Sequence, residues 1–108
     1  MSLKPSNEQL RNIAAEFGTP LYVYHADRIS HQYLQLQNAF KGTDKVRFFY
    51  ACKALTNINI LKHIRQIGCN VDCSSINEAK LAVYAGFSQQ NILYTSNGIA
   101  FEEIEEAV

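Results

Sequence analysis

The stretch that decides the fold is an apolar run that ends at a lysine, Val46-Arg47-Phe48-Phe49-Tyr50-Ala51-Cys52-Lys53. Such a run is typical of a buried strand, and Thr56-Asn57 shortly after it can cap a helix. A lysine at the C-terminal end of a parallel strand lies where α/β folds place their functional groups, and its amine can attack a carbonyl carbon. The structural alternative is a lysine whose long side chain reaches from the strand end to water. Position alone favours this alternative.

Outward from this run, the sequence alternates between strand and helix patterns. Ser75 and Glu78 form a capping box that marks one helix start, and Gly18, Gly68 and Gly86 stand where helices are expected to stop. The predicted strands are 21–24, 46–52, 70–74 and 91–95, and the predicted helices are 10–17, 29–40, 58–67, 75–85 and one that starts at 101. Three strand–helix units in succession predict a parallel sheet covered by helices.

The short, even units favour a (β/α)8 barrel over a doubly wound sheet. No Gly-x-Gly-x-x-Gly motif follows any predicted strand, which weakens a dinucleotide-binding fold. A whole barrel needs roughly 250 residues, whereas this chain has 108. We therefore predict an α/β fold that is the N-terminal portion of a barrel, incomplete in this chain, and we expect a larger parent protein.

Composition excludes several classes of function. Ten basic and ten acidic residues cancel, so nucleic acid and anionic membranes are not expected partners. No apolar stretch approaches the length of a membrane span and no signal sequence is recognisable, which predicts a cytoplasmic protein. The three cysteines, at positions 52, 69 and 73, and the scattered histidines predict reduced thiols and no metal site.

Four segments resemble the diaminopimelate decarboxylase family. The family's opening resembles Gly18-Thr19-Pro20-Leu21-Tyr22-Val23-Tyr24, and its Tyr-Ala-x-Lys-Ala motif resembles Tyr50-Ala51-Cys52-Lys53-Ala54. Its Asp-x-x-Ser-x-x-Glu segment matches Asp72-Cys73-Ser74-Ser75-Ile76-Asn77-Glu78, and its next strand and turn resemble Ile92-Leu93-Tyr94-Thr95-Ser96-Asn97-Gly98. The segments occur in the family's order and spacing and cover nearly the whole chain.

The resemblance implies a fold and a reaction. It implies a barrel of the alanine-racemase type that binds pyridoxal 5′-phosphate, followed by a β-domain. Residues 1–24 would form a helix and a strand that joins this β-domain, and residues 25–108 the first three β/α units of the barrel. The full enzyme would decarboxylate meso-diaminopimelate, a small amino-acid substrate, to L-lysine in lysine biosynthesis. It would be a homodimer with shared active sites, and the present chain alone would be inactive.

The resemblance also implies roles for particular residues. Lys53 would be the catalytic residue and would hold the cofactor. The remaining implied cofactor-binding residues are Asp72, Ala51, Glu78 and Asn97. Three of them have a structural alternative: a turn or cap carboxylate for Asp72, helix capping for Glu78 and an ordinary turn for Asn97.

Two other functions stay open at this point. One is a related decarboxylase that acts on ornithine, arginine or carboxynorspermidine. The other is a non-catalytic homologue that serves as a binding partner, against which the presence of Lys53 argues. The sequence also departs from the family pattern: Leu55 stands where asparagine is common, and Ile76-Asn77 where two glycines are common.

Overall fold

The structure is a computed structural model that describes residues 3–96, 98 and 100–108, and the chain divides into two compact units, Met1–Lys41 and Gly42–Val108. The first unit contains the helices α1 (Asn7–Phe17) and α2 (Ala26–Ala39). Ser6 and Gln9 form a capping box that starts α1, because each side chain accepts the other's backbone amide. Neither helix has a fully buried residue.

The strand predicted at 21–24 is not formed. Residues 21–25 have no regular secondary structure, and Leu21, Tyr22, Val23 and Tyr24 are all exposed. A strand needs a neighbour to accept and donate its backbone hydrogen bonds, and the residues that the structure describes supply none here. The prediction that this segment joins a later β-domain is not tested by this finding.

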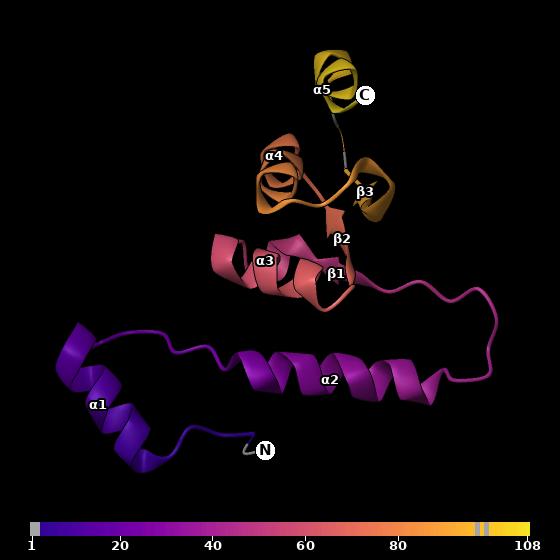
Figure 1. Ribbon diagram of the computed structural model, residues 1–108. Coiled ribbons are helices and arrows are strands. Elements are labelled where there is room, and N and C mark those ends of the chain that lie inside the picture. The colour runs from indigo at the N-terminus through magenta and orange to yellow at the C-terminus, as the bar shows by residue number, and fades with distance from the viewer. Residues whose placement is uncertain (1–2, 97, 99) are drawn as a thin grey trace. The chain divides into compact units, whose positions relative to one another are not determined.

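The second unit contains the three predicted β/α units (Figure 1). Its strands are β1 (Phe49–Ala51), β2 (Asn70–Cys73) and β3 (Ile92–Tyr94), and its helices are α3 (Ile58–Gln66), α4 (Ile76–Ala85) and α5 (Phe101–Ala107). Short 3₁₀ helices follow β1 at Cys52–Ala54 and precede β3 at Gln89–Asn91. The strands form one parallel sheet in the order β1-β2-β3, as the sequence predicts.

β1 is shorter than the apolar run that predicted it. The run begins at Val46, but the strand begins at Phe49, which pairs with Asn70, the first residue of β2. A parallel strand extends only as far as its partner does, so residue pairing begins at Phe49, although the Phe48 carbonyl still accepts the Asn70 amide at 3.1 Å. At the other end Cys52 turns into a 3₁₀ helix, where its carbonyl accepts the Leu55 amide.

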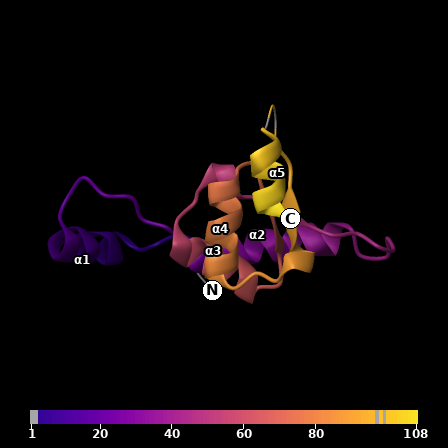
Figure 2. The same ribbon diagram turned by 90° about the horizontal axis from the view of Figure 1, so that it is seen from above.

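One face of this sheet is covered and the other is open. Val71 and Cys73 in β2 are fully buried, while the alternate residues Asn70 and Asp72 are only half-buried. α4 contacts β2 and β3, and α3 and α4 pack side by side (Figure 2). Since side chains alternate along a strand, the helices cover one set and leave the other set exposed. The core on the covered face consists of Cys52, Leu61, Ile64, Cys69, Val71, Cys73, Ala82, Ala85 and Phe87.

Predicted caps position the two helices of this core. The Asn57 side chain accepts the amides of Asn59 and Ile60 at the start of α3. α4 ends at Gly86, whose φ of +100° is left-handed, and Arg65 of α3 donates to the carbonyl of Ala85 at 3.1 Å. A Cβ at position 86 would meet Arg65 Nε at 3.0 Å, so glycine serves both the conformation and this contact.

Among the described residues, no helix combines the length and apolar character that a membrane span requires. The same part of the chain contains no cluster of three or more His, Cys, Asp or Glu side chains placed to hold a metal ion.

The buried Leu61 predicts where the second unit is most sensitive. Its side chain is fully buried, so Leu61→Ala should lower the free energy of unfolding by about 2–5 kcal/mol through lost contacts and a residual cavity. Leu34→Ala is the matched control, because Leu34 is 54% exposed on α2 and should cost less than about 1 kcal/mol. Urea unfolding followed by circular dichroism measures both, and equal losses would contradict this description of the core.

Candidate active site

The sheet register brings the predicted site residues to one edge. Ala51, the last residue of β1, pairs with Asp72 in β2, and Lys53 follows two residues later in the 3₁₀ helix. The carboxyl ends of parallel strands meet at the same edge, which is where α/β proteins place ligands. The structure therefore puts Ala51, Asp72 and the Lys53 turn side by side.

Hydrogen bonds hold the turn that carries Lys53. The Tyr50 hydroxyl donates to the Leu55 carbonyl at 2.9 Å, and the Leu55 amide donates to the Cys52 carbonyl at 3.2 Å. Cys52 itself is fully buried and anchors the turn in the core. The backbone around Lys53 is thus fixed from both sides.

Lys53 is exposed, although the sequence predicted a buried strand before it. Only Cys52 in that stretch is buried: Phe49 and Tyr50 are half-buried, and Ala51 is exposed because it lies on the open face. Within the described part of the chain, the Lys53 amine makes no hydrogen bond or ion pair. In particular, no ion pair joins it to Asp72. A primary amine with no partner is chemically available to a carbonyl compound.

Asp72 is held by a residue that the sequence analysis did not single out. The Thr95 hydroxyl donates to Asp72 Oδ1 at 2.6 Å. Thr95 directly follows β3, and its backbone amide donates to the Cys73 carbonyl at 2.8 Å, which continues the β2–β3 ladder. The signal that could have found this pair is register: once β2 and β3 are aligned, Thr95 falls beside Asp72 and Cys73.

Glu78 acts as the predicted helix cap, with one difference. The Ser75 hydroxyl accepts the Glu78 amide at 3.2 Å, as the capping box requires. The Glu78 carboxylate, however, reaches back to Ser74, whose amide and hydroxyl donate to it at 3.3 and 2.9 Å. It accepts the Ser75 hydroxyl more weakly, at 3.4 Å. These bonds hold Glu78 in the β2–α4 turn.

A pair of buried thiols lies beneath this edge. Cys52 and Cys73 interact with each other, and Cys52 also faces the Glu78 carboxylate. Burial, followed by the negative charge of Glu78, raises the pKa of Cys52 above its ordinary value of 9.0. Burial and the neighbouring Cys52 raise the pKa of Cys73 to about 12. Both thiols therefore stay protonated at neutral pH.

Asn97 lies outside the described residues, so its predicted place at the site has no structural account. Ala51 is exposed on the open face next to Asp72, and its small side chain leaves space above the strand end.

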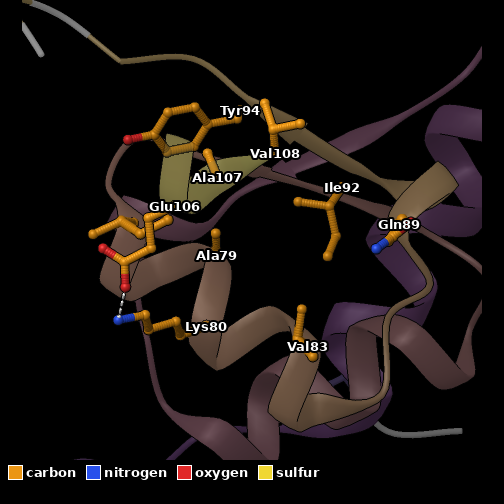
Figure 3. Close-up of a pocket in the computed structure, with 10 residues that line it drawn as sticks. Ala79, Lys80, Val83, Gln89, Ile92, Tyr94, Glu106, Ala107 and Val108 are labelled. Carbon is orange, nitrogen blue, oxygen red and sulfur yellow. Dashed lines mark ion pairs between the residues drawn. The ribbon is translucent and has the colours of Figure 1, made fainter. Parts of the chain in front are cut away.

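A cavity of about 380 Å³ lies elsewhere, between α4, α5 and β3 (Figure 3). Its lining is mainly apolar and includes Ala79, Val83 and Ile92, with an ion pair between Lys80 and Glu106 at its rim. Neither Lys53 nor Asp72 lines it. The cavity is a gap in the helix packing on the covered face and is separate from the candidate site.

The residues at the sheet edge fit pyridoxal 5′-phosphate by their chemistry. An exposed primary amine with no partner among the described residues suits attachment to the cofactor's aldehyde, and a fixed carboxylate stands at the matching position of the next strand.

Comparison with known proteins agrees with this chemistry. Residues 26–108 match the pyridoxal binding domain of the pyridoxal-dependent decarboxylases. The chain is 39% identical over 97 residues to diaminopimelate decarboxylase of Methanothermobacter thermautotrophicus, an alignment that covers 89% of this chain and 23% of that protein. This chain therefore belongs to the pyridoxal-dependent decarboxylase family, and the predicted cofactor class is confirmed.

Solved structures show the same fold. Diaminopimelate decarboxylase of Helicobacter pylori in complex with L-lysine superposes with a TM-score of 0.83 at 34% identity, over 91% of this chain and 25% of that one. Lysine/ornithine decarboxylase of Vibrio vulnificus in complex with putrescine gives 0.84 at 25% identity, over 94% and 28%. The predicted fold class, the N-terminal portion of a (β/α)8 barrel, is confirmed. The chain spans about a quarter of the length of these proteins.

The buried thiols predict slow chemical labelling. Since the thiolate is the reactive form, Cys52, Cys69 and Cys73 should resist iodoacetamide at about pH 8 in the folded chain and react rapidly after unfolding in guanidinium. Mass spectrometry of the quenched reaction measures this. Rapid labelling of Cys73 without unfolding would contradict its burial.

Because of the same thiols, the free energy of unfolding should fall as the pH rises into the alkaline range. Each folded-state pKa is raised, so the unfolded chain loses its thiol protons first as the pH rises. For Cys73, the favourable contribution is complete below the ordinary value of 9.0 and is lost as the pH rises toward about 12. Cys73→Ser should therefore lose stability less steeply over that window than the parent chain, and equal slopes would exclude a contribution from this thiol.

Proposed function

We propose that this chain is part of a pyridoxal 5′-phosphate-dependent diaminopimelate decarboxylase, which removes carbon dioxide from meso-diaminopimelate to give L-lysine. The observation that carries the proposal is the exposed Lys53 amine at the carboxyl end of β1, which has no partner in the part of the chain that the structure describes, with Asp72 at the adjacent position of β2. The family match supports it, because the matched domain is the one that binds pyridoxal.

Each residue at this sheet edge has a proposed role at the cofactor site. Lys53 holds the cofactor through its amine, which the bonded turn from Tyr50 to Leu55 keeps at the strand end. Asp72 orients the lysine or the cofactor ring, and Ala51 leaves room for that ring. When bound, pyridoxal phosphate supplies a ring that accepts the electrons released by loss of the carboxyl group.

Glu78 and Asn97 have a supporting part in the proposal. Glu78 contributes through the β2–α4 turn, where its carboxylate holds Ser74 and faces the Cys52 thiol. Asn97, which follows β3 in the sequence, is proposed to line the cofactor site.

The choice of substrate rests on similarity. The chain is more similar to the diaminopimelate decarboxylases, at 39% and 34% identity, than to the lysine/ornithine decarboxylase, at 25%. The latter structure contains putrescine, a diamine, so a related substrate with a terminal amine is the second candidate. Incubating the full-length parent with meso-diaminopimelate, lysine, ornithine and arginine separately, and measuring carbon dioxide release from each, distinguishes the candidates.

Further parts of the proposal concern the whole protein. A homodimer with shared active sites, a cytoplasmic location and inactivity of the present chain alone remain predictions. So does the division into residues 1–24 and 25–108. The family match supports this division, because it begins at residue 26.

Covalent labelling tests the role of Lys53. In the full-length parent, borohydride reduction should fix pyridoxal phosphate to one lysine, and peptide mapping should place it on Lys53, because this amine stands at the strand end without a partner among the described residues. Lys53→Ala should abolish the label and lower the rate of carbon dioxide release by several orders of magnitude, on the order of 10³-fold or more, because it removes the attachment point.

A second exposed lysine of the same unit is the control. Lys62 lies on α3 with its amine over the Tyr84 ring, and Lys62→Ala should keep both the label and the activity. Label found on Lys45 or Lys62, or no label at all, would refute the proposed function.

A further inference from the structure

We propose that Thr95 is a positioning residue for the active site, which fixes the carboxylate of Asp72 beside the Lys53 turn. The inference rests on the proposed function and adds to it a residue on the third strand end. Three neighbouring strands then contribute to one site: Lys53 after β1, Asp72 from β2 and Thr95 after β3.

The Thr95 hydroxyl bonds directly to the Asp72 carboxylate. Thr95 Oγ1 lies 2.6 Å from Asp72 Oδ1, although the two residues are 23 positions apart in the sequence. An ionised carboxylate can only accept, so the threonine hydroxyl is the donor. The separation falls in the range of roughly 2.5–2.7 Å that is typical of hydroxyl donors to carboxylates, the stronger class of hydrogen bond.

Thr95 is itself held in place by β2. Its backbone amide donates to the Cys73 carbonyl at 2.8 Å, so its backbone is tied to β2 one residue beyond Asp72. Threonine is branched at Cβ and has few side-chain conformations. The hydroxyl therefore occupies a place that the sheet determines, and it can act as a reference point for the more freely rotating carboxylate of Asp72.

The other carboxylate oxygen of Asp72 is available to a further group. Asp72 Oδ2 accepts no hydrogen bond from any residue that the structure describes. Asp72 pairs with Ala51, two residues before Lys53, and both lie on the open face. With Oδ1 held by Thr95, Oδ2 is left to interact with a bound group or with the lysine that holds it.

The Thr95–Asp72 bond positions the Asp72 carboxylate but contributes little to the stability of the fold. Thr95 is exposed, and the bond to Asp72 lies at the surface of the sheet edge. A hydrogen bond that is open to water contributes little to folding, because water replaces either partner when the bond is lost. In this chain, its loss should therefore move the Asp72 carboxylate more than it lowers the free energy of unfolding.

The test uses the full-length holoenzyme and a pair of substitutions at one position. Thr95→Val keeps the shape and removes the hydroxyl, whereas Thr95→Ser keeps the hydroxyl. Thr95→Val should lower kcat by about 10–100-fold, because a misplaced group next to the chemistry costs on that order. It should retain bound cofactor and change the visible circular dichroism of that cofactor. Thr95→Ser should restore both signals to near the wild-type values.

A double-mutant cycle tests whether Thr95 acts through Asp72. In the Asp72→Ala background, Thr95→Val should lower kcat no further, because its partner is already absent. Thr43→Val is the matched control: Thr43 is exposed in the segment before β1, has no hydrogen bond among the described residues, and should behave as wild type. Unchanged kcat and dichroism in Thr95→Val, failure of Thr95→Ser to restore them, or additive losses in the double variant would each overturn the proposal.

A further measurement keeps this result distinct from the proposed function. If the wild-type parent neither binds pyridoxal phosphate nor releases carbon dioxide, the proposed function fails. The positioning of Asp72 is still decided by the carbon-13 chemical shift of its carboxyl carbon in the protein without added cofactor. This shift should move in Thr95→Val and return in Thr95→Ser, and an identical shift in all three proteins would overturn the inference.

Discussion

The parallel pairing of β2 with both of its neighbours is the constraint on which the rest of the second unit depends. It sets Ala51 opposite Asp72 and Cys73 opposite Tyr94, so the three strands end at a common edge. Lys53, Asp72 and Thr95 come from three different strand ends, about 20 residues apart in the sequence. The ladder of backbone hydrogen bonds, rather than any contact between side chains, brings the Lys53 turn, Asp72 and Thr95 together.

Residues buried on the covered face support the strand ends at that edge. Cys52 and Cys73 are fully buried against the helices, and each is a direct neighbour in sequence of a residue at the candidate site. Burial keeps these thiols protonated and apolar in character, which is why they serve as packing groups. The Glu78 carboxylate, which closes the β2–α4 turn through Ser74, adds a polar contact between this core and the turn of Lys53.

The features that the sequence predicted well are those that depend on nearby residues. Asn57 and Ser75 cap their helices as expected, since a cap bonds to amides two or three residues away. Lys53 follows its strand as predicted, but its exposure depends on which face of the sheet the helices cover. The strand expected at 21–24 failed for lack of a pairing partner, and the Thr95–Asp72 bond requires the register of two strands. Both are long-range properties, which local patterns do not contain.

At the ends of β1 and β2, adjacent residues point to opposite sides, through the turn after β1 and through the alternation of side chains along β2. Cys52 faces the core while Lys53 faces outward, and Cys73 faces the core while Asp72 lies on the open side. Within this chain, substitutions on the open side of the sheet leave the buried residues of its covered face in place, because the two sets of side chains point to opposite sides. The reverse is not true: enlarging the side chain at position 52 or 73 would displace the backbone next to Lys53 or Asp72. The interior of this sheet thus limits how far its chemistry can be altered.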